Sequence, residues 1–336
     1  MTTATVDHLY SGLAAARAIR GVSPVLEVPF TAEGEIDLPG FRRVVRYVLG
    51  TGVTSVMFPG FAGEFYKLSD VERTTLTETL IEEAQAFPAA IVIAAVQDHA
   101  TKLAVARARW SVAAGAKALN LLPPHLLNLP APVVDTHIRA VLTAVPDTPV
   151  VLQYAPNETG ASLDASRLAA IGRDHPNLVL VKVESSPPGP FISELARLDP
   201  PMLAVEGYAG VQLPDAIRRG AVGTQPGCSF TEIYQEIWRL YECGDERTGD
   251  LLHARLLPYT SYWMLDTELI IAAEKLISKR RGLIDSDHCR APRRDLDEQE
   301  VAAVERFLAE FADLLPDVSG TAADHVPETV GEEGRH

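Results

Sequence analysis

Cysteines are scarce in this sequence, and long apolar runs are absent. The three cysteines, Cys228, Cys243 and Cys289, lie far apart, without a second cysteine or a histidine at metal-ligand spacing. A disulfide framework and a metal site are therefore not expected. No apolar run approaches the roughly 18 residues of a membrane helix, and residues 1–21 lack the apolar core of a secretory signal. We expect a cytoplasmic protein without a membrane partner.

Cationic residues are outnumbered by acidic ones. The 30 Lys and Arg residues face 45 Asp and Glu residues, which gives a formal net charge of −15. Nucleic acids bind basic surfaces, so a nucleic-acid partner is not expected. With 336 residues, 47% of them apolar, the chain has the profile of a globular protein. This length allows two domains, or one α/β barrel of about 250 residues with a remainder.

Short apolar runs alternate with helix-period segments along most of the chain, and this alternation predicts a parallel α/β fold. Amphipathic helices are predicted over Leu38–Leu49, Asp70–Ala86, Thr101–Ala114 and Val133–Val145. Strands are predicted near Val22–Val28, Ser55–Phe58, Ala90–Val96, Ala118–Leu122, Pro149–Tyr154, Leu178–Val183, Met202–Val205 and Ala221–Thr224. Eight successive β-α pairs favour a closed barrel. No G-x-G-x-x-G follows the first strand, which weighs against an open dinucleotide-binding sheet.

The strand pattern stops after Phe230, so the chain divides into unequal parts. We predict an N-terminal segment over residues 1–20, a (β/α)8 barrel over 21–230 and a C-terminal helical extension over 231–315. The extension comprises Thr231–Tyr241, Glu246–Lys279 with a break near Pro258, and Asp297–Leu315. Residues 316–336 are rich in Gly, Pro, Thr and acids, which predicts a flexible tail.

Lys182 interrupts the apolar run Leu178–Val183, which is typical of a strand buried on both faces. Lysine is almost never buried without a partner. Desolvation favours a neutral amine, which is the form that attacks a carbonyl carbon and forms a Schiff base. Two interpretations stay open: Lys182 is a nucleophile, or it extends to solvent or pairs with Glu184 on the same face of the strand.

Tyr154 ends the strand that precedes the one with Lys182. In parallel barrels the active site is built at the carboxyl ends of the strands, so Tyr154 and Lys182 are expected to be neighbours there. A tyrosine hydroxyl near an iminium carbon could shuttle protons. The alternative is an aromatic lid whose hydroxyl lies in water.

Several motifs, in this order, resemble the dihydrodipicolinate synthase and N-acetylneuraminate lyase superfamily over roughly residues 20–315. They are Val28-Pro29-Phe30 with Gly34-Glu35-Ile36-Asp37, similar to T-P-F and G-x-(I/V)-D; Gly60-Phe61-Ala62-Gly63-Glu64, similar to G-(T/S)-T-G-E; Pro123-Pro124-His125, similar to P-P-Y; Tyr154 before Pro156 and Thr159-Gly160, similar to Y-N-x-P-x-x-T-G; Lys182 after Pro176-Asn177; and Gly220-Ala221-x-Gly223, similar to G-A-x-G. Each motif is short, but their common order and spacing are specific.

The resemblance implies a (β/α)8 TIM barrel with three C-terminal helices, assembled as a homo-oligomer, either a tetramer or a dimer. It implies a class I lyase or aldolase in which Lys182 forms an iminium with a small-molecule 2-oxo acid, commonly pyruvate. Tyr154 would be the proton shuttle, and no cofactor would be needed. Backbone N–H groups of the turn Gly60, Phe61, Ala62 and Gly63 would hold the substrate carboxylate.

The sequence departs from this pattern at four positions. The two hydroxyl residues of the turn are Phe61 and Ala62 here, which removes the side-chain contact to the carboxylate and the threonine link of the proton relay. Glu158 stands where dihydrodipicolinate synthases place an arginine, so an anionic second substrate would meet a like charge. His125 replaces the tyrosine of P-P-Y. Standard dihydrodipicolinate synthesis is therefore not expected.

Acidic and polar residues also follow several strands. Alternation along the first strand directs Glu27 inward with Val25, although Glu27 could instead pair with a nearby Lys or Arg. Together with His125, Glu158, Glu184, Glu206 and Gln225, it is a candidate substrate contact. Two other functions remain open: a sugar-acid dehydratase or hydratase that uses the same iminium, and a barrel that has lost catalysis and only binds a ligand.

Overall fold

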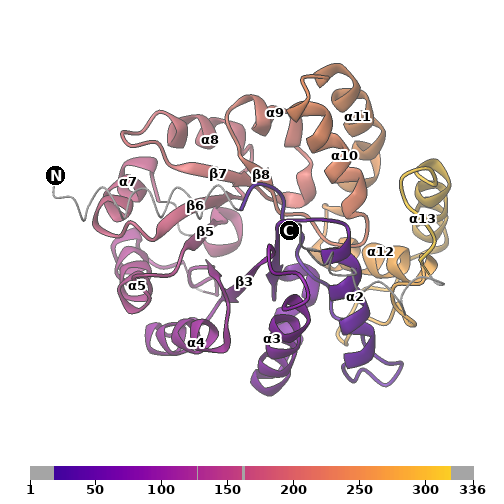
Figure 1. Ribbon diagram of the computed structural model, residues 1–336, viewed down its shortest axis with the longest axis horizontal. Coiled ribbons are helices and arrows are strands. Elements are labelled where there is room, and N and C mark those ends of the chain that lie inside the picture. Colours follow the sequence, from indigo (N-terminus) through magenta and orange to yellow (C-terminus); the bar gives the residue numbers. More distant parts are fainter. Residues whose placement is uncertain (1–18, 127, 161–162, 319–336) are drawn as a thin grey trace, which may run out of the picture.

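The computed structural model describes residues 19–126, 128–160 and 163–318, apart from the side chain of Glu158. Its centre is a sheet of eight parallel strands in the order β1-β8-β7-β6-β5-β4-β3-β2 (Figure 1). Their bounds are β1 Gly21–Val22, β2 Ser55–Phe58, β3 Ile91–Val96, β4 Ala118–Leu121, β5 Val150–Tyr154, β6 Leu178–Val183, β7 Leu203–Glu206 and β8 Gly223–Thr224. Bridges from Val25 to Met57 and to Gly227 join the two ends of this order. The predicted barrel is confirmed.

The first strand is shorter than the sequence predicts. The regular ladder ends at Val22, and only the bridges of Val25 continue it. Pro24 has no backbone N–H and cannot donate to a ladder, although its carbonyl accepts a hydrogen bond from the N–H of Met57 at 2.9 Å. The backbone beyond Val22 therefore closes the barrel through single bridges.

Helices follow the strands and surround the barrel (Figure 1). They are α2 Leu38–Gly50, α3 Asp70–Ala84, α4 Thr101–Ala114, α5 Ala131–Ala144, α7 Ala165–Asp174, α8 Gly189–Ala196 and α9 Leu213–Arg218, with short turns η1 Phe61–Gly63, η2 Phe65–Lys67, α6 Pro156–Thr159 and η3 Tyr208–Gly210. A capping box at Ser69 and Glu72 starts α3, because the two side chains satisfy backbone N–H groups that the first turn leaves free.

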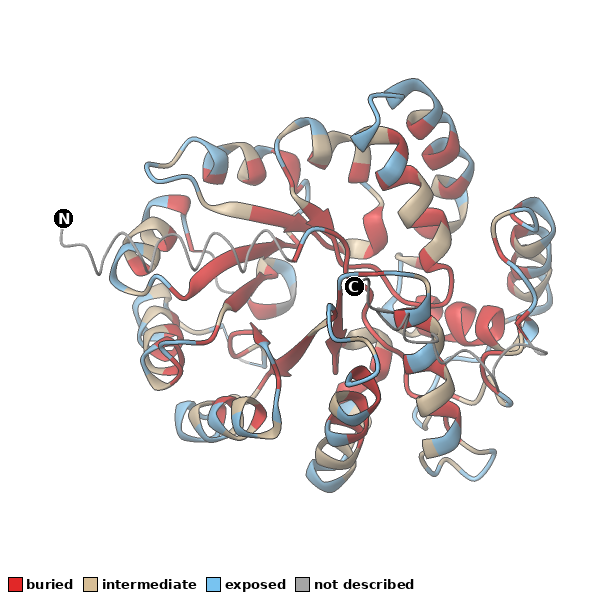
Figure 2. Cartoon of the chain, in the orientation of Figure 1, coloured by how far each residue is buried: buried red, intermediate tan, exposed pale blue. Residues whose placement is uncertain are grey.

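The strands are buried on both faces (Figure 2). Val151 of β5, Leu180 of β6 and Val205 of β7 pack inside the barrel. Leu152 of β5 and Val181 of β6 pack outward with the surrounding helices. Burial on both sides explains the near-continuous apolar runs of the sequence. Alternation along each strand then decides which polar side chain enters the barrel.

Four helices form the C-terminal extension: α10 Thr231–Glu242, α11 Glu246–Trp263, α12 Thr267–Arg280 and α13 Glu298–Glu310. The predicted break at Pro258 is wrong, because α11 continues through the proline. A proline inside a helix removes one hydrogen bond, but Leu256, Thr260 and Trp263 are buried around it and hold the helix. The break instead follows Trp263, and Asp266 caps α12 by accepting from the N–H of Leu269 at 3.0 Å.

The extension positions one helix for function. In α12, every residue from Leu269 to Ser278 is buried, and the helix contacts the η1 turn that follows β2. It therefore lies against the carboxyl ends of the strands.

Among the described residues, no helix is both long and apolar enough to span a membrane. The predicted N-terminal segment and flexible tail fall almost wholly outside the described residues.

Candidate active site

A cavity of about 100 Å³ lies between the carboxyl ends of the strands and α12. Such a volume holds several waters or a small organic molecule. Its lining comes from the bridge residue Val25 and the η1 turn (Phe61, Ala62), from β6 and the segment after it (Lys182, Glu184), from the segments after β7 and β8 (Tyr208, Ala209, Gln225, Pro226, Gly227), from the C-cap of α11 (Met264) and from α12 (Thr267, Ile270, Ile271, Glu274). This is the end of the barrel where active sites of this fold are built.

Lys182 lies at the cavity with its side chain almost wholly buried, 5% exposed. Its Nζ is 3.1 Å from Oε1 of Glu184, which is also buried and lines the cavity. The sequence left nucleophile and ion pair open as alternatives, and the structure shows the ion pair at the cavity itself. The two interpretations are compatible, because Glu184 can take the proton that the lysine must lose before it attacks a carbonyl.

A chain of amide side chains holds Glu184 in place. Nε2 of Gln153 donates to Oε2 of Glu184 at 2.6 Å, and Nδ2 of Asn120 donates to Oε1 of Gln153 at 2.9 Å. Both amides are buried. Gly207 makes room for the carboxylate, since a Cβ there would lie 2.3 Å from Cγ of Glu184. One oxygen of Glu184 is thus fixed by Gln153, and the other faces Lys182.

The structure does not bring Tyr154 to Lys182. Gln153 is the residue of β5 that lies in register with Lys182, and Tyr154, one residue later, points to the opposite face of the strand. Its ring packs in the cluster between the strands and the helices and stacks on Phe191 of α8, with ring centroids 4.2 Å apart. The expectation that Tyr154 lies beside the lysine is therefore wrong, because alternation turns it outward.

The η1 turn forms one wall of the cavity through Phe61 and Ala62. Its glycines are sterically required, since a Cβ at Gly60 would lie 2.4 Å from a methyl of Val25 and one at Gly63 would lie 2.9 Å from the carbonyl of Leu26. The N–H groups of Gly63 and Glu64 are already used within the turn, donating to the carbonyls of Gly60 and Phe61. Carboxylate binding by this turn stays a prediction, and within it the backbone N–H groups of Phe61 and Ala62 are the candidate donors.

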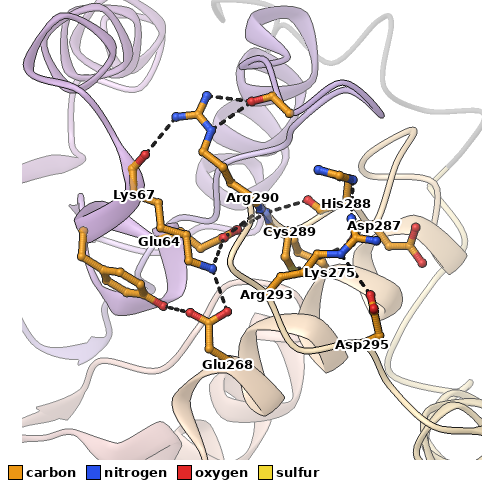
Figure 3. A network of polar contacts seen from close by, with 12 residues as sticks. Glu64, Lys67, Glu268, Lys275, Asp287, His288, Cys289, Arg290, Arg293 and Asp295 are labelled. Carbon is orange, nitrogen blue, oxygen red and sulfur yellow. Dashed lines mark hydrogen bonds and ion pairs between the residues drawn. The ribbon is translucent and has the colours of Figure 1, made fainter.

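A buried ion network joins this turn to α12 (Figure 3). Glu64 is fully buried and accepts from Nζ of Lys275 on α12 and, at 3.0 Å, from Nζ of Lys67. Lys67 also pairs with Glu268 of α12 at 2.7 Å, and the backbone N–H of Arg290 donates to Glu64 at 3.1 Å. These ion pairs hold α12 against the turn. Lys275 is next to the cavity residue Glu274 in sequence, so the network also helps to position the part of α12 that lines the cavity.

We expect Lys275→Met to destabilise the fold by about 3 kcal/mol, because it leaves the buried carboxylate of Glu64 with less compensating charge. Lys279→Met, on the same helix, is the matched control. Lys279 is 37% exposed and pairs with Asp287 at 2.9 Å, and such a pair contributes less than about 1 kcal/mol. Urea unfolding measures both changes. Equal losses in the two variants would show that the Glu64 network does not stabilise the fold.

Two of the predicted acidic contacts lie beside the cavity and not in its lining. Glu27 is buried and accepts from the hydroxyl of Ser278 on α12, and burial raises its pKa to about 7. Glu206 accepts from Oγ1 of Thr224 at 3.0 Å and from the N–H of Gln212 at 3.3 Å, and burial raises its pKa to about 8. Both carboxyls accept hydrogen bonds within the protein, although Oε2 of Glu27 has no hydrogen-bond partner among the described residues, and neither residue lines the cavity.

Of the remaining predicted substrate contacts, Gln225 lines the cavity and His125 does not. Oε1 of Gln225 is buried without a hydrogen-bond partner in the described part of the chain. His125 packs on His99, with ring centroids 4.4 Å apart, and burial lowers its pKa. The side chain of Glu158 is outside the described residues.

Glu274 of α12 is a cavity residue that sequence reasoning missed. Its carboxyl lies over Gly227, where a Cβ would be 1.8 Å from Oε2. The signal available in the sequence is a Glu-Lys pair inside the apolar run of residues 269–277, and charged side chains in such a run need a specific reason.

In residues 19–126, 128–160 and 163–318, no group of three or more His, Cys, Asp or Glu could hold a metal ion.

The nearly closed barrel and the buried lysine at its carboxyl end define a (β/α)8-barrel protein with an enclosed site for a small molecule. The chain belongs to the Dihydrodipicolinate synthetase family, whose model matches residues 18–311. This confirms the family predicted from the motifs.

Relatives of known name agree with this assignment. A DapA-like lyase of Halobacterium salinarum, itself uncharacterised, is 29% identical over 87% of this chain and 94% of its own. The L-2-keto-3-deoxyarabonate dehydratase of Azospirillum brasilense is 24% identical over 82% of this chain and 89% of its own. The crystal structure of the E. coli prophage protein YagE in complex with pyruvate superposes with a TM-score of 0.79 at 21% identity, covering 87% of this chain and 98% of that one. The chain is thus a member of a lyase family.

Proposed function

We propose that this protein is a Schiff-base lyase that acts on a 2-oxo acid through an iminium on Lys182. The observation that carries the proposal is the buried lysine at the cavity with a carboxylate 3.1 Å from its amine. A lyase family and a relative crystallised with pyruvate support it. A homo-oligomeric state and a cytoplasmic location remain predictions from the sequence.

The first step requires one group that accepts a proton and later returns it, and we assign this role to Glu184. Glu184 takes a proton from the Lys182 ammonium, and the neutral amine attacks the C2 carbonyl of the substrate. After the proton shifts within the adduct, protonated Glu184 returns its proton to the C2 hydroxyl, which leaves as water. The products are the iminium, water and ionised Glu184. The carboxylate can then remove a proton from C3 and form the enamine.

Borohydride trapping tests the proposal. The protein is incubated with pyruvate or with longer, hydroxylated 2-oxo acids and then reduced, and its intact mass is measured. We expect a stable mass increase equal to one reduced imine per chain with at least one of these acids, and none when borohydride is added without an acid. No increase with any acid would contradict the Schiff-base mechanism and favour a barrel that only binds a ligand.

Dehydration of a hydroxylated 2-oxo acid is the second candidate, and the dehydratase of Azospirillum brasilense among the relatives favours it. It begins with the same iminium but eliminates water in place of breaking a C–C bond. Product analysis separates the two reactions. A lyase of the aldolase type releases a smaller carbonyl fragment, whereas a dehydratase yields a product with the full carbon chain.

A further inference from the structure

The cavity has an unusual charge balance for a site that binds an anionic acid. Among the lining residues that the structure describes, Lys182 is the one cation, and its charge is matched by Glu184. Glu274 adds a second carboxyl to the lining. If both carboxyls were ionised, they would repel the carboxylate of a 2-oxo acid. The positions that carry hydroxyls in the family's turn motif are Phe61 and Ala62, so those donors are missing as well.

Glu274 has a buried carboxyl oxygen, Oε2, that lacks a hydrogen-bond partner within the described residues. The residue is only 4% exposed. Buried polar atoms are almost always paired in folded proteins. Gly227, which also lines the cavity, leaves space for the carboxyl. The neighbouring Lys275 is engaged by Glu64 (Figure 3), so its ammonium is not the partner of Glu274.

We propose that Glu274 is a specificity residue that binds the carboxylate of the 2-oxo acid by donating a hydrogen bond from a neutral carboxyl group. This inference rests on the proposed function, since it assigns a role toward the same substrate. A hydrogen bond from a carboxylic acid to a carboxylate is charge-assisted and therefore strong. It would replace the donors that the turn lacks and remove the like charge from the cavity.

The surroundings of Glu274 keep it protonated at neutral pH. Burial raises its pKa to about 8, the nearby carboxyl of Glu27 acts in the same direction, and contacts with Ser229 oppose them. Cys228 and Tyr234 also face this carboxyl, and burial raises the pKa of each well above its usual value, so both stay neutral. Burial also raises the pKa of Glu27, to about 7, so the two acids titrate in overlapping pH ranges and the midpoint seen for Glu274 includes the coupling between them.

The test measures how the half-saturating concentration for borohydride trapping depends on pH, using pyruvate and methyl pyruvate as probes. The ester forms the same imine but carries no carboxylate. For pyruvate relative to the ester, we expect the half-saturating concentration to rise about tenfold between pH 7 and 9, as Glu274 loses its proton. Taking the ratio to the ester cancels the pH dependence of imine formation that the two probes share.

Two variants isolate the carboxyl group. Glu274→Gln keeps an N–H donor and does not titrate, so it should stay within about threefold of the parent at pH 7 and show no rise at pH 9. Glu274→Leu removes the donor and should raise the half-saturating pyruvate concentration about 10- to 100-fold at pH 7 while leaving methyl pyruvate little changed. Glu298→Gln, at an exposed position of α13, is the control for a Glu-to-Gln change away from the cavity and should match the parent.

The outcomes separate the two proposals. An adduct whose pyruvate dependence is the same in the parent, Glu274→Gln and Glu274→Leu would overturn the role of Glu274 and leave the Schiff-base mechanism standing. A pH-dependent rise that persists in Glu274→Gln would also overturn it. The absence of any trapped adduct in the parent protein would overturn the proposed function, and the role of Glu274 with it.

Discussion

We expect Lys182→Ala to abolish adduct formation and to lower turnover by at least about 10⁴-fold, because Lys182 is the one lysine among the described residues that line the cavity. Lys67 and Lys275, on η2 and α12, do not line the cavity, and both are engaged by the carboxylate of Glu64. The measurement is the initial rate with whichever 2-oxo acid is trapped, together with intact mass after reduction.

Lys182→Arg is the companion variant, because the alanine change leaves the buried Glu184 without its cationic partner and can destabilise the fold. Arginine keeps the positive charge but remains protonated and cannot act as a nucleophile. We expect Lys182→Arg to fold, as judged by its thermal unfolding, and to be as inactive as the alanine variant. Substantial turnover in either variant would contradict the role of Lys182.

We expect Glu184→Gln to lower turnover by about 10²- to 10⁴-fold, the range for loss of a general acid-base group. The amide preserves the shape of the side chain but cannot take the lysine proton or return it to the leaving hydroxyl. Glu194→Gln, an exposed glutamate of α8, is the matched control and should keep the parent rate within about twofold. The measurement is turnover at saturating substrate across a range of pH.

Tyr154→Phe distinguishes the carboxylate from the tyrosine as proton shuttle. Tyr154 faces the helices and stacks on Phe191, and phenylalanine preserves that stacking. Turnover should therefore fall by no more than about threefold, in contrast to Glu184→Gln. A loss of about 100-fold in Tyr154→Phe, with little change in Glu184→Gln, would contradict the geometry derived for the site.

The sequence predicted the barrel well because its signal is local. Each of the buried strands, such as β6, is a short apolar run, and alternation with amphipathic helices leaves few possible topologies. Lys182 was identifiable for the same reason, since it is the charged residue inside such a run. Its partner Glu184 lies two residues away and shares its face of the strand.

The sequence showed less clearly which residues of β5 face the interior of the barrel. Gln153 and Tyr154 both end an apolar run, and the motif resemblance favoured the tyrosine. Only one of two adjacent residues can face the barrel, and the register with Lys182 selects Gln153. A shift of one residue exchanges the two faces of a strand, so this error moved the predicted proton shuttle to the opposite side of the sheet.

The contribution of α12 depends on tertiary structure. Glu27 was expected in the cavity from strand alternation, but Ser278 of α12 binds its carboxyl. Glu274, on the same helix as Ser278, is the carboxyl residue that lines the cavity where Glu27 was expected. Nothing local indicates that α12 covers the mouth of the barrel, because its position is set by contacts between residues about 200 positions apart, such as Lys275 with Glu64.

The most direct test of the central claim is to digest the borohydride-reduced adduct and locate the added mass by peptide sequencing. The account predicts that the modified residue is Lys182 and that the peptides containing Lys67, Lys117 and Lys275 are unchanged. A substrate-dependent modification on any other lysine, with Lys182 unmodified, would contradict the proposed site and the mechanism built on it.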